Sequence, residues 1–192
     1  MAGLSLDEFA FDEGADMAPY IETERLILRE MRRDDFAAFA AIWREPEVVR
    51  FIGAEARSEA ESWSAFLKNA GSWAIERFGQ WAIVRKSDGV FCGQVGFFRA
   101  MRGLGADFDA APEAGWVLGA EFHGQGYGRE AVTAAHMWFD AQPFGGKSHA
   151  IIEAGHAVSF GLAMRLGYRA MREADFGGAR VTLLVRSPDE GG

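Results

Sequence analysis

The sequence predicts an α/β fold built on one mixed sheet, with the element order β-α-α-β-β-β-α-β-α-β-β. Three observations support this prediction. Two stretches with helical spacing follow the first predicted strand, alternating apolar segments then form a run of strands, and a glycine-rich turn leads from a strand into an amphipathic helix. No repeat and no long Pro-rich or Ser-rich linker divides the chain, so we expect one domain over residues 18–192.

Each element follows from a local pattern. Residues 25–29 form the first strand, and Asp34 is the expected N-cap of the first helix. Ser58 and Glu61 have the spacing of a capping box, which predicts that the second helix begins there. The later elements are strands at 80–85, 90–99, 113–118, 149–153, 168–176 and 180–186, and helices at about 129–140 and 157–166.

The charge balance excludes some classes of protein. The chain has 20 Lys and Arg against 28 Asp and Glu, for a formal net charge of -8. Binding to nucleic acid requires a basic face, so a nucleic-acid partner is not expected. No stretch approaches the ~18 apolar residues of a membrane span, and the N-terminus lacks the basic and apolar regions of a signal peptide. We therefore expect a cytoplasmic protein with no membrane partner.

Residues 1–17 form an acidic leader with no Lys or Arg. This composition predicts a flexible segment. The leader also contains four apolar residues, Leu4, Leu6, Phe9 and Phe11, which keep a second interpretation open. In that interpretation the leader docks on the domain or on a second subunit. We therefore expect a monomer or a homodimer.

Metal-ligand spacing is absent from the sequence. The single cysteine, Cys92, cannot form a thiolate zinc site, and the four histidines have no HExxH or similar spacing. No metal is predicted. His136 and His149 are interpreted as surface residues or as structural residues with satisfied hydrogen bonds.

Residues 116–129, WVLGAEFHGQGYGR, carry the clearest chemical signal. Glycines between a strand and a helix N-terminus let backbone N–H groups converge on a phosphate, where the helix dipole favours negative charge. The turn therefore predicts an anion site, although such turns also occur for steric reasons alone. A dinucleotide fingerprint needs glycine where Arg129 stands, and a P-loop ending at Ser148 needs glycine where Ala141 stands. Neither nucleotide motif fits.

The segment from His123 to Gly128, HGQGYG, closely resembles the Q/RxxGxG/A signature of the GNAT N-acetyltransferase superfamily. Four other segments, over about residues 20–186, are similar to the branch that contains ribosomal-protein N-terminal acetyltransferases: TERLILR from Thr23, GQVG from Gly93, EAGWVL from Glu113 and RLGY from Arg165. The resemblance implies the GNAT fold and the co-substrate acetyl-CoA. It implies the following contacts for that molecule: Trp116, Val117, Leu118, Gly119, His123, Gly124, Gln125, Gly126, Tyr127, Gly128, Arg129, His156 and Ser159.

Three positions depart from the family pattern. His123 stands where Gln or Arg is usual, and His156 stands where Asn is common. Ala163 stands where many members have a tyrosine that acts as general acid. The acid must then be another group, or must be unnecessary because a thiol with pKa of about 8.5 is a tolerable leaving group.

We expect an N-acetyltransferase in which a primary amine attacks the thioester directly. Ser159 is the expected donor to the departing sulfur. Glu113 is the expected general base because it opens the strand whose later residues hold the pantetheine. The alternative for Glu113 is a structural ion pair with an arginine such as Arg99. Asp107 and Asp109 precede Glu113 in the sequence, and two interpretations stay open for them. Either they form, with Glu113, a carboxylate rim that attracts a cationic amine, or they are solvated charges of a loop.

Two other functions are each favoured by one feature of the sequence. A GNAT-like domain that binds acyl-CoA without turnover is favoured by the departures at His156 and Ala163. A serine hydrolase is suggested by AVSFG around Ser159, but that fold places its catalytic histidine after the serine, and no histidine follows Ser159.

Overall fold

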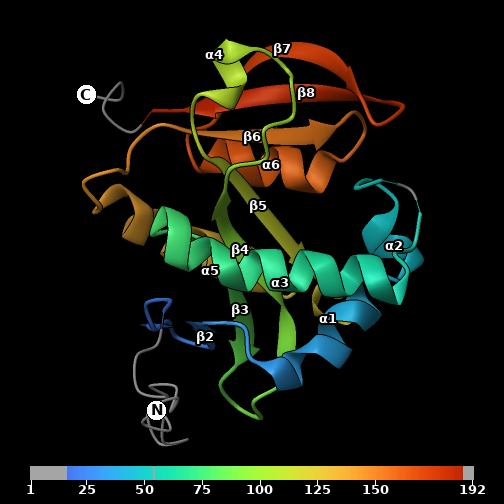
Figure 1. The fold of residues 1–192 in the computed structure, drawn as a ribbon, viewed down its shortest axis with the longest axis vertical. Coiled ribbons are helices and arrows are strands. Elements are labelled where there is room, and N and C mark those ends of the chain that lie inside the picture. Colours follow the sequence, from blue (N-terminus) through green and yellow to red (C-terminus); the bar gives the residue numbers. More distant parts are fainter. Residues whose placement is uncertain (1–16, 54, 188–192) are drawn as a thin grey trace, which may run out of the picture.

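The computed structural model describes residues 17–53 and 55–187 and contains one mixed sheet of eight strands (Figure 1). The strand order is β1-β2-β3-β4-β5-β6-β8-β7. The predicted fold class is confirmed. The strands are β1 (Ile21–Glu22), β2 (Leu26–Arg29), β3 (Gln80–Arg85), β4 (Phe91–Phe98), β5 (Glu113–Leu118), β6 (Ser148–Glu153), β7 (Arg169–Phe176) and β8 (Ala179–Arg186).

Helices cover both faces of the sheet. The helices are α1 (Phe36–Ile42), α2 (Pro46–Val49), α3 (Glu59–Glu76), α4 (Ala106–Asp109), α5 (Tyr127–Asp140) and α6 (Ala157–Arg165). In Figure 1, α3 crosses in front of the sheet, while α5 and α6 lie behind it. Single turns of 3₁₀ helix precede α1 and follow β5.

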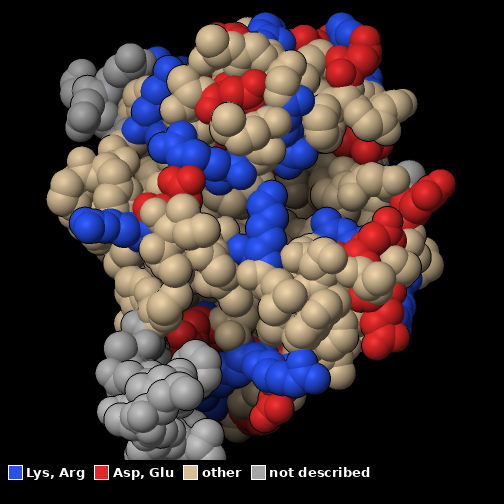
Figure 2. Space-filling view, in the orientation of Figure 1, with Lys and Arg blue, Asp and Glu red and all other residues tan. Residues whose placement is uncertain are grey.

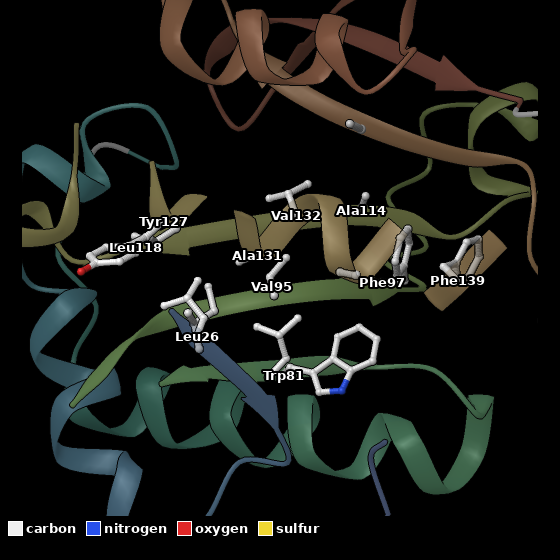
Figure 3. Close-up of a cluster of buried hydrophobic side chains, with 14 of the residues drawn as sticks. Leu26, Trp81, Val95, Phe97, Ala114, Leu118, Tyr127, Ala131, Val132 and Phe139 are labelled. Carbon is white, nitrogen blue, oxygen red and sulfur yellow. The ribbon is translucent and has the colours of Figure 1, made fainter. Parts of the chain in front are cut away.

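The alternation of side chains along the strands builds a core on each face. On the α5 face, Ile83 and Val95 pack with Ala131 and Phe139, as Figure 3 shows for three of these residues, Val95, Ala131 and Phe139. On the α1 and α3 face, the intervening strand residues pack with the two helices in a second cluster that includes Phe39, Phe66, Ala82, Val84 and Val117. The strands therefore lie between two apolar layers, and neither face of the central sheet is left to solvent.

The predicted start of the first helix is wrong by one residue, because Asp34 lies inside the 3₁₀ turn and Asp35 is the N-cap of α1, whereas the predicted start of α3 is confirmed. The Ser58 hydroxyl accepts from Glu61 N–H at 3.2 Å and the Glu61 carboxylate accepts from Ser58 N–H at 2.8 Å, so the predicted capping box begins α3. Three short elements were not predicted: β1, α2 and α4. Each has four residues or fewer, which is too short for a period of 2 or 3.6 to be visible. Of the predicted leader, only Met17 belongs to the described residues.

The ladder of the sheet is almost interrupted between β5 and β6. Six residue pairs join β4 to β5 and six join β6 to β8. Only the pair Glu113 and His149 joins β5 to β6, the one parallel pairing of the described sheet. Beyond Glu113 the two strands diverge, and an opening separates them toward the end of β5.

Candidate functional site

The opening, meaning the gap between the diverging backbones of β5 and β6, leaves backbone groups of β5 without ladder partners. The N–H of Gly119 donates to the carbonyl of Cys92 on β4 at 3.0 Å. Because successive residues of a strand direct their backbone groups to opposite sides, the groups of Trp116 and Leu118 face β6. The His123 ring donates to the Leu118 carbonyl at 2.9 Å. Among the described residues, the N–H groups of Trp116 and Leu118 and the carbonyl of Trp116 then have no hydrogen-bond partner, and they form a short, unpaired strand edge.

A glycine turn lies at the end of the same strand. Gly124 and Gly126 have φ of 72° and 82°, in the left-handed region that favours glycine. Gly126 is the N-cap of α5 and offers no side chain to cap it. The first helical N–H groups, at Tyr127, Gly128 and Arg129, therefore point out of the helix end without a side-chain acceptor. This arrangement suits an anion at the helix N-terminus.

Arg25, the residue before β2, braces the turn. Its guanidinium donates to the carbonyl of Gln125 at 2.9 Å and lies 4.6 Å from the ring centroid of Tyr127. The same guanidinium forms an ion pair with Glu130 at 2.7 Å, and Thr23 donates to that carboxylate at 2.6 Å. Sequence reasoning missed this role, because Arg25 and Gln125 are a hundred positions apart. The only signal was that Thr23 and Arg25 belong to the segment that resembles the family.

Ser159 and His156 lie at the start of α6, which follows β6 beside the opening. The Ser159 hydroxyl accepts from the indole N–H of Trp116 at 3.2 Å and is 3.0 Å from His156 Nε2. The imidazole ring of His156 stacks on Phe51, with 4.5 Å between centroids and 20° between planes. Burial, and to a lesser extent the nearby His123, lower the pKa of His156. His156 is therefore held neutral by its surroundings at neutral pH.

Comparison with known proteins identifies the family. A family model described as an acetyltransferase (GNAT) domain matches residues 25–169. The chain belongs to the GNAT acetyltransferase family.

A solved structure named "Putative GnaT-family acetyltransferase from Bordetella pertussis" is 28% identical to this chain, with a TM-score of 0.80, and the match covers 88% of this chain and 100% of that chain. The ribosomal L7/L12 α-N-protein acetyltransferase RimL, solved with coenzyme A, is 15% identical, with a TM-score of 0.74. The match covers 89% of this chain and 99% of that chain. That likeness shows a shared fold. The Bacillus subtilis protein named "Uncharacterized N-acetyltransferase YoaA" is 27% identical over 118 residues, 61% of this chain and 64% of that protein's length.

The three carboxylates predicted to attract the amine all hydrogen-bond to arginines. Glu113 is buried, with 6% of its side chain exposed, and both of its oxygens accept from Arg102, at 2.6 and 2.7 Å. Asp109 accepts from the backbone N–H of Arg102, and Asp107 pairs with Arg172 at 3.0 Å. On the face of the molecule drawn in Figure 2, Lys and Arg side chains lie around a hollow at the centre. Glu113 thus has an arginine partner, but the partner is Arg102; Arg99 pairs with Glu76 instead.

Three aromatic side chains of the segment that follows β2 differ in how close they lie to the site: Trp43, Phe51 and Trp63. Phe51 reaches the opening through its stack on His156. Trp43 is buried beneath the guanidinium of Arg57, and Trp63 packs on Phe66. These two tryptophans belong to the core between the first helices and the sheet.

The other two histidines are structural. His136 donates to the Val132 carbonyl at 2.8 Å and accepts from the Tyr168 hydroxyl at 2.9 Å. His149 is fully buried and its Nδ1 donates to the Phe108 carbonyl, but its Nε2 has no hydrogen-bond partner among the described residues, so the expectation of satisfied hydrogen bonds holds for His136 and is wrong for His149. Among the described residues, no cluster of three or more His, Cys, Asp or Glu is arranged to hold a metal ion, and no helix is long and apolar enough to cross a membrane.

Proposed function

We propose that this protein transfers the acetyl group of acetyl-CoA to a primary amine by direct attack of the amine on the thioester. One observation carries the proposal: the unpaired edge of β5 leads directly into the uncapped N-terminus of α5. A ligand such as acetyl-CoA, whose pantetheine arm carries amide groups and leads to a pyrophosphate, needs both features. It needs strand-like hydrogen-bond partners along its length and converging N–H donors at its charged end.

The residues of the site fit acetyl-CoA in charge and in hydrogen-bonding groups. The turn from Gly124 to Arg129 would hold the pyrophosphate, with Arg25 and Arg129 adding positive charge. The backbone groups of Trp116 and Leu118 would bind the pantetheine amides and polarise the thioester carbonyl. Val117 and Gly119 contribute less to this edge, because the alternation of the strand directs their backbone groups toward β4. When bound, acetyl-CoA supplies the activated acetyl group.

Ser159 and Glu113 are the proposed proton-handling residues. Ser159 lies between Trp116 and His156 and offers a hydroxyl to the leaving sulfur. An acceptor amine is mostly ammonium at pH 7 and must lose a proton before it attacks. Glu113 is the proposed base for that step, acting directly or through water, although its ion pair with Arg102 leaves it fewer free lone pairs. Peptide N-termini, amino sugars, aminoglycosides and polyamines all meet these requirements.

The proposal is tested by combining acetyl-CoA with a panel of these amines and recording both free thiol and product mass. Thermal unfolding is measured in parallel, since a ligand at 100 times its Kd raises the free energy of unfolding by about 2.7 kcal/mol. We expect a higher Tm with acetyl-CoA, thiol release with at least one amine and a mass increase on that amine. No Tm shift at millimolar acetyl-CoA would contradict the assignment of the ligand.

The same experiment separates transfer from binding alone. A domain that binds acyl-CoA without turnover is favoured by Ala163, which is buried and offers no acid where many relatives have tyrosine. It predicts a Tm shift with no thiol released above background for any amine.

A further inference from the structure

Ser159 occupies an unusual position between two ring nitrogens. A serine hydroxyl has one hydrogen to donate and two lone pairs to accept with. The indole nitrogen of Trp116 can only donate, so it occupies one lone pair of Ser159 at 3.2 Å. The Nε2 atom of His156 lies 3.0 Å from the same oxygen and can occupy the second lone pair if it carries the ring proton.

We propose that Trp116 and His156 together position Ser159, by filling both of its lone pairs, so that its hydroxyl hydrogen is left to donate into the opening toward the thioester sulfur. This inference rests on the proposed acetyl transfer and assigns to the Trp116 side chain a role that its place on the strand did not suggest. Trp116 and His156 act through Ser159, so they are positioning residues.

The surroundings hold this arrangement in place. The Trp116 ring packs against the core on the α5 and α6 face, and its own backbone groups face the opening, so the indole joins the strand edge to α6. The imidazole of His156 is fixed on one side by the stack with Phe51. Because each hydrogen bond polarises the next, two N–H groups donating to the oxygen also make its hydroxyl a stronger donor.

The chemical step balances as follows. The acceptor nitrogen forms a bond to the acetyl carbon, and the bond from that carbon to sulfur breaks, with its electron pair going to sulfur. The Ser159 hydroxyl stabilises the developing thiolate by a hydrogen bond. The ammonium loses two protons overall, of which one neutralises the thiolate and the other is released to solvent. No oxidant or further reactant is required.

The test compares Trp116→Phe, Ser159→Ala and the double variant in steady-state assays with acetyl-CoA and an amine that the unmodified protein acetylates. Loss of one neutral hydrogen bond predicts that Trp116→Phe lowers kcat by about threefold to tenfold, with KM for acetyl-CoA within about twofold. We expect Ser159→Ala to lower kcat at least as much. The double variant should be no slower than Ser159→Ala alone, because Trp116 acts only through that hydroxyl.

Two matched variants separate positioning from general damage. Trp81→Phe also removes a buried indole N–H, one that donates to the Pro19 carbonyl at 2.8 Å away from the opening, and should leave kcat unchanged. His156→Gln keeps an N–H donor and should retain more activity than His156→Leu.

Additive losses in the double variant, or a Ser159→Ala protein as fast as the parent, would overturn the inference while leaving the proposed function standing. Failure of the unmodified protein to acetylate any amine would overturn both.

Discussion

The guanidinium of Arg25 joins Glu130, in the first turn of α5, to the carbonyl of Gln125 in the glycine turn. The ion pair measures 2.7 Å, and the Arg25 backbone N–H also donates to the Glu130 carboxylate at 2.8 Å. One side chain thus fixes both the helix and the loop that precedes it. The candidate phosphate site, which follows β5, is therefore held in shape by a residue beside β2, three strands away in the sheet.

Replacing Arg25 with Met should weaken acetyl-CoA binding by about tenfold, since a charge-assisted hydrogen bond contributes roughly 1.5 kcal/mol and the turn loses its brace. The free energy of unfolding should change little, because the Arg25 side chain is 41% exposed and such pairs are screened. Calorimetric titration measures the affinity. Arg180→Met, which breaks an exposed pair with Glu173 on the last hairpin, is the control and should bind normally. Equal affinities for both variants would exclude the bracing role.

Gly126→Val should abolish the Tm shift caused by acetyl-CoA. At φ of 82° a β-branched residue is strained, and its Cβ would lie 3.3 Å from the Arg25 guanidinium, beside the N–H groups of the turn. Gly178→Val is a matched control: its φ is 79°, and a Cβ there meets nothing within 4 Å. It should show similar backbone strain and keep the shift. A folded Gly126→Val protein that binds as well as the parent would make the turn purely steric.

Glu113→Gln should lower turnover by roughly 100-fold or more if the carboxylate is the general base, with acetyl-CoA affinity unchanged and partial recovery as pH rises. The ion pair with Arg102 predicts a second effect, a lower free energy of unfolding. Arg102→Met breaks the same pair but keeps the carboxylate, so it should lose stability and retain turnover per folded molecule. Should Glu113→Gln stay within twofold of the parent from pH 6 to 9, the carboxylate is structural, and Asp107 or Asp109 becomes the next candidate.

Acid should destabilise the fold through His136. Burial lowers the pKa of His136 to about 4, and its Nε2 accepts from Tyr168, which a protonated ring cannot do. In the unfolded chain this pKa is about 6.5, so between pH 6.5 and about 4 the unfolded state binds the extra proton. The free energy of unfolding should therefore fall as pH decreases through that window, by up to ~3 kcal/mol. Urea titrations at several pH values measure this slope, and His136→Gln should reduce it. An unchanged slope would assign the effect to other groups.

The start of α3 and the ranges of most strands could be predicted because their signals are local. Ser58 and Glu61 are three positions apart, and strand β5 was predicted at its observed bounds. The glycine turn likewise needs no distant partner. The helix after it begins at Tyr127, two residues before the predicted start, because glycine at 128 is compatible with a first helical turn even though it weakens the helix pattern.

The side-chain pairings could not be predicted, because they depend on how loops return to the sheet. Arg99 and Arg102 lie on the same connection before β5, and nothing local decides which of them pairs with Glu113. The contact between Trp116 and Ser159 spans 43 positions and joins β5 to α6, two elements that share no local sequence signal. His149 was interpreted as a surface or satisfied structural residue, and it is buried against Phe108 on a one-turn helix that has no periodic signal.

The single residue pair between β5 and β6 has a thermodynamic consequence. The sheet consists of two parts. Strands β1 to β5 form one part and strands β6, β8 and β7 form the other, and a single residue pair joins the two. A pantetheine arm that pairs with the free edge of β5 and packs on α6 would contact both parts at once. By linkage, the free energy that favours binding is then also the free energy that opposes separation of the two parts. If acetyl-CoA is the ligand, its binding would add to the core packing that already holds the two parts together, by an amount that rises with its concentration.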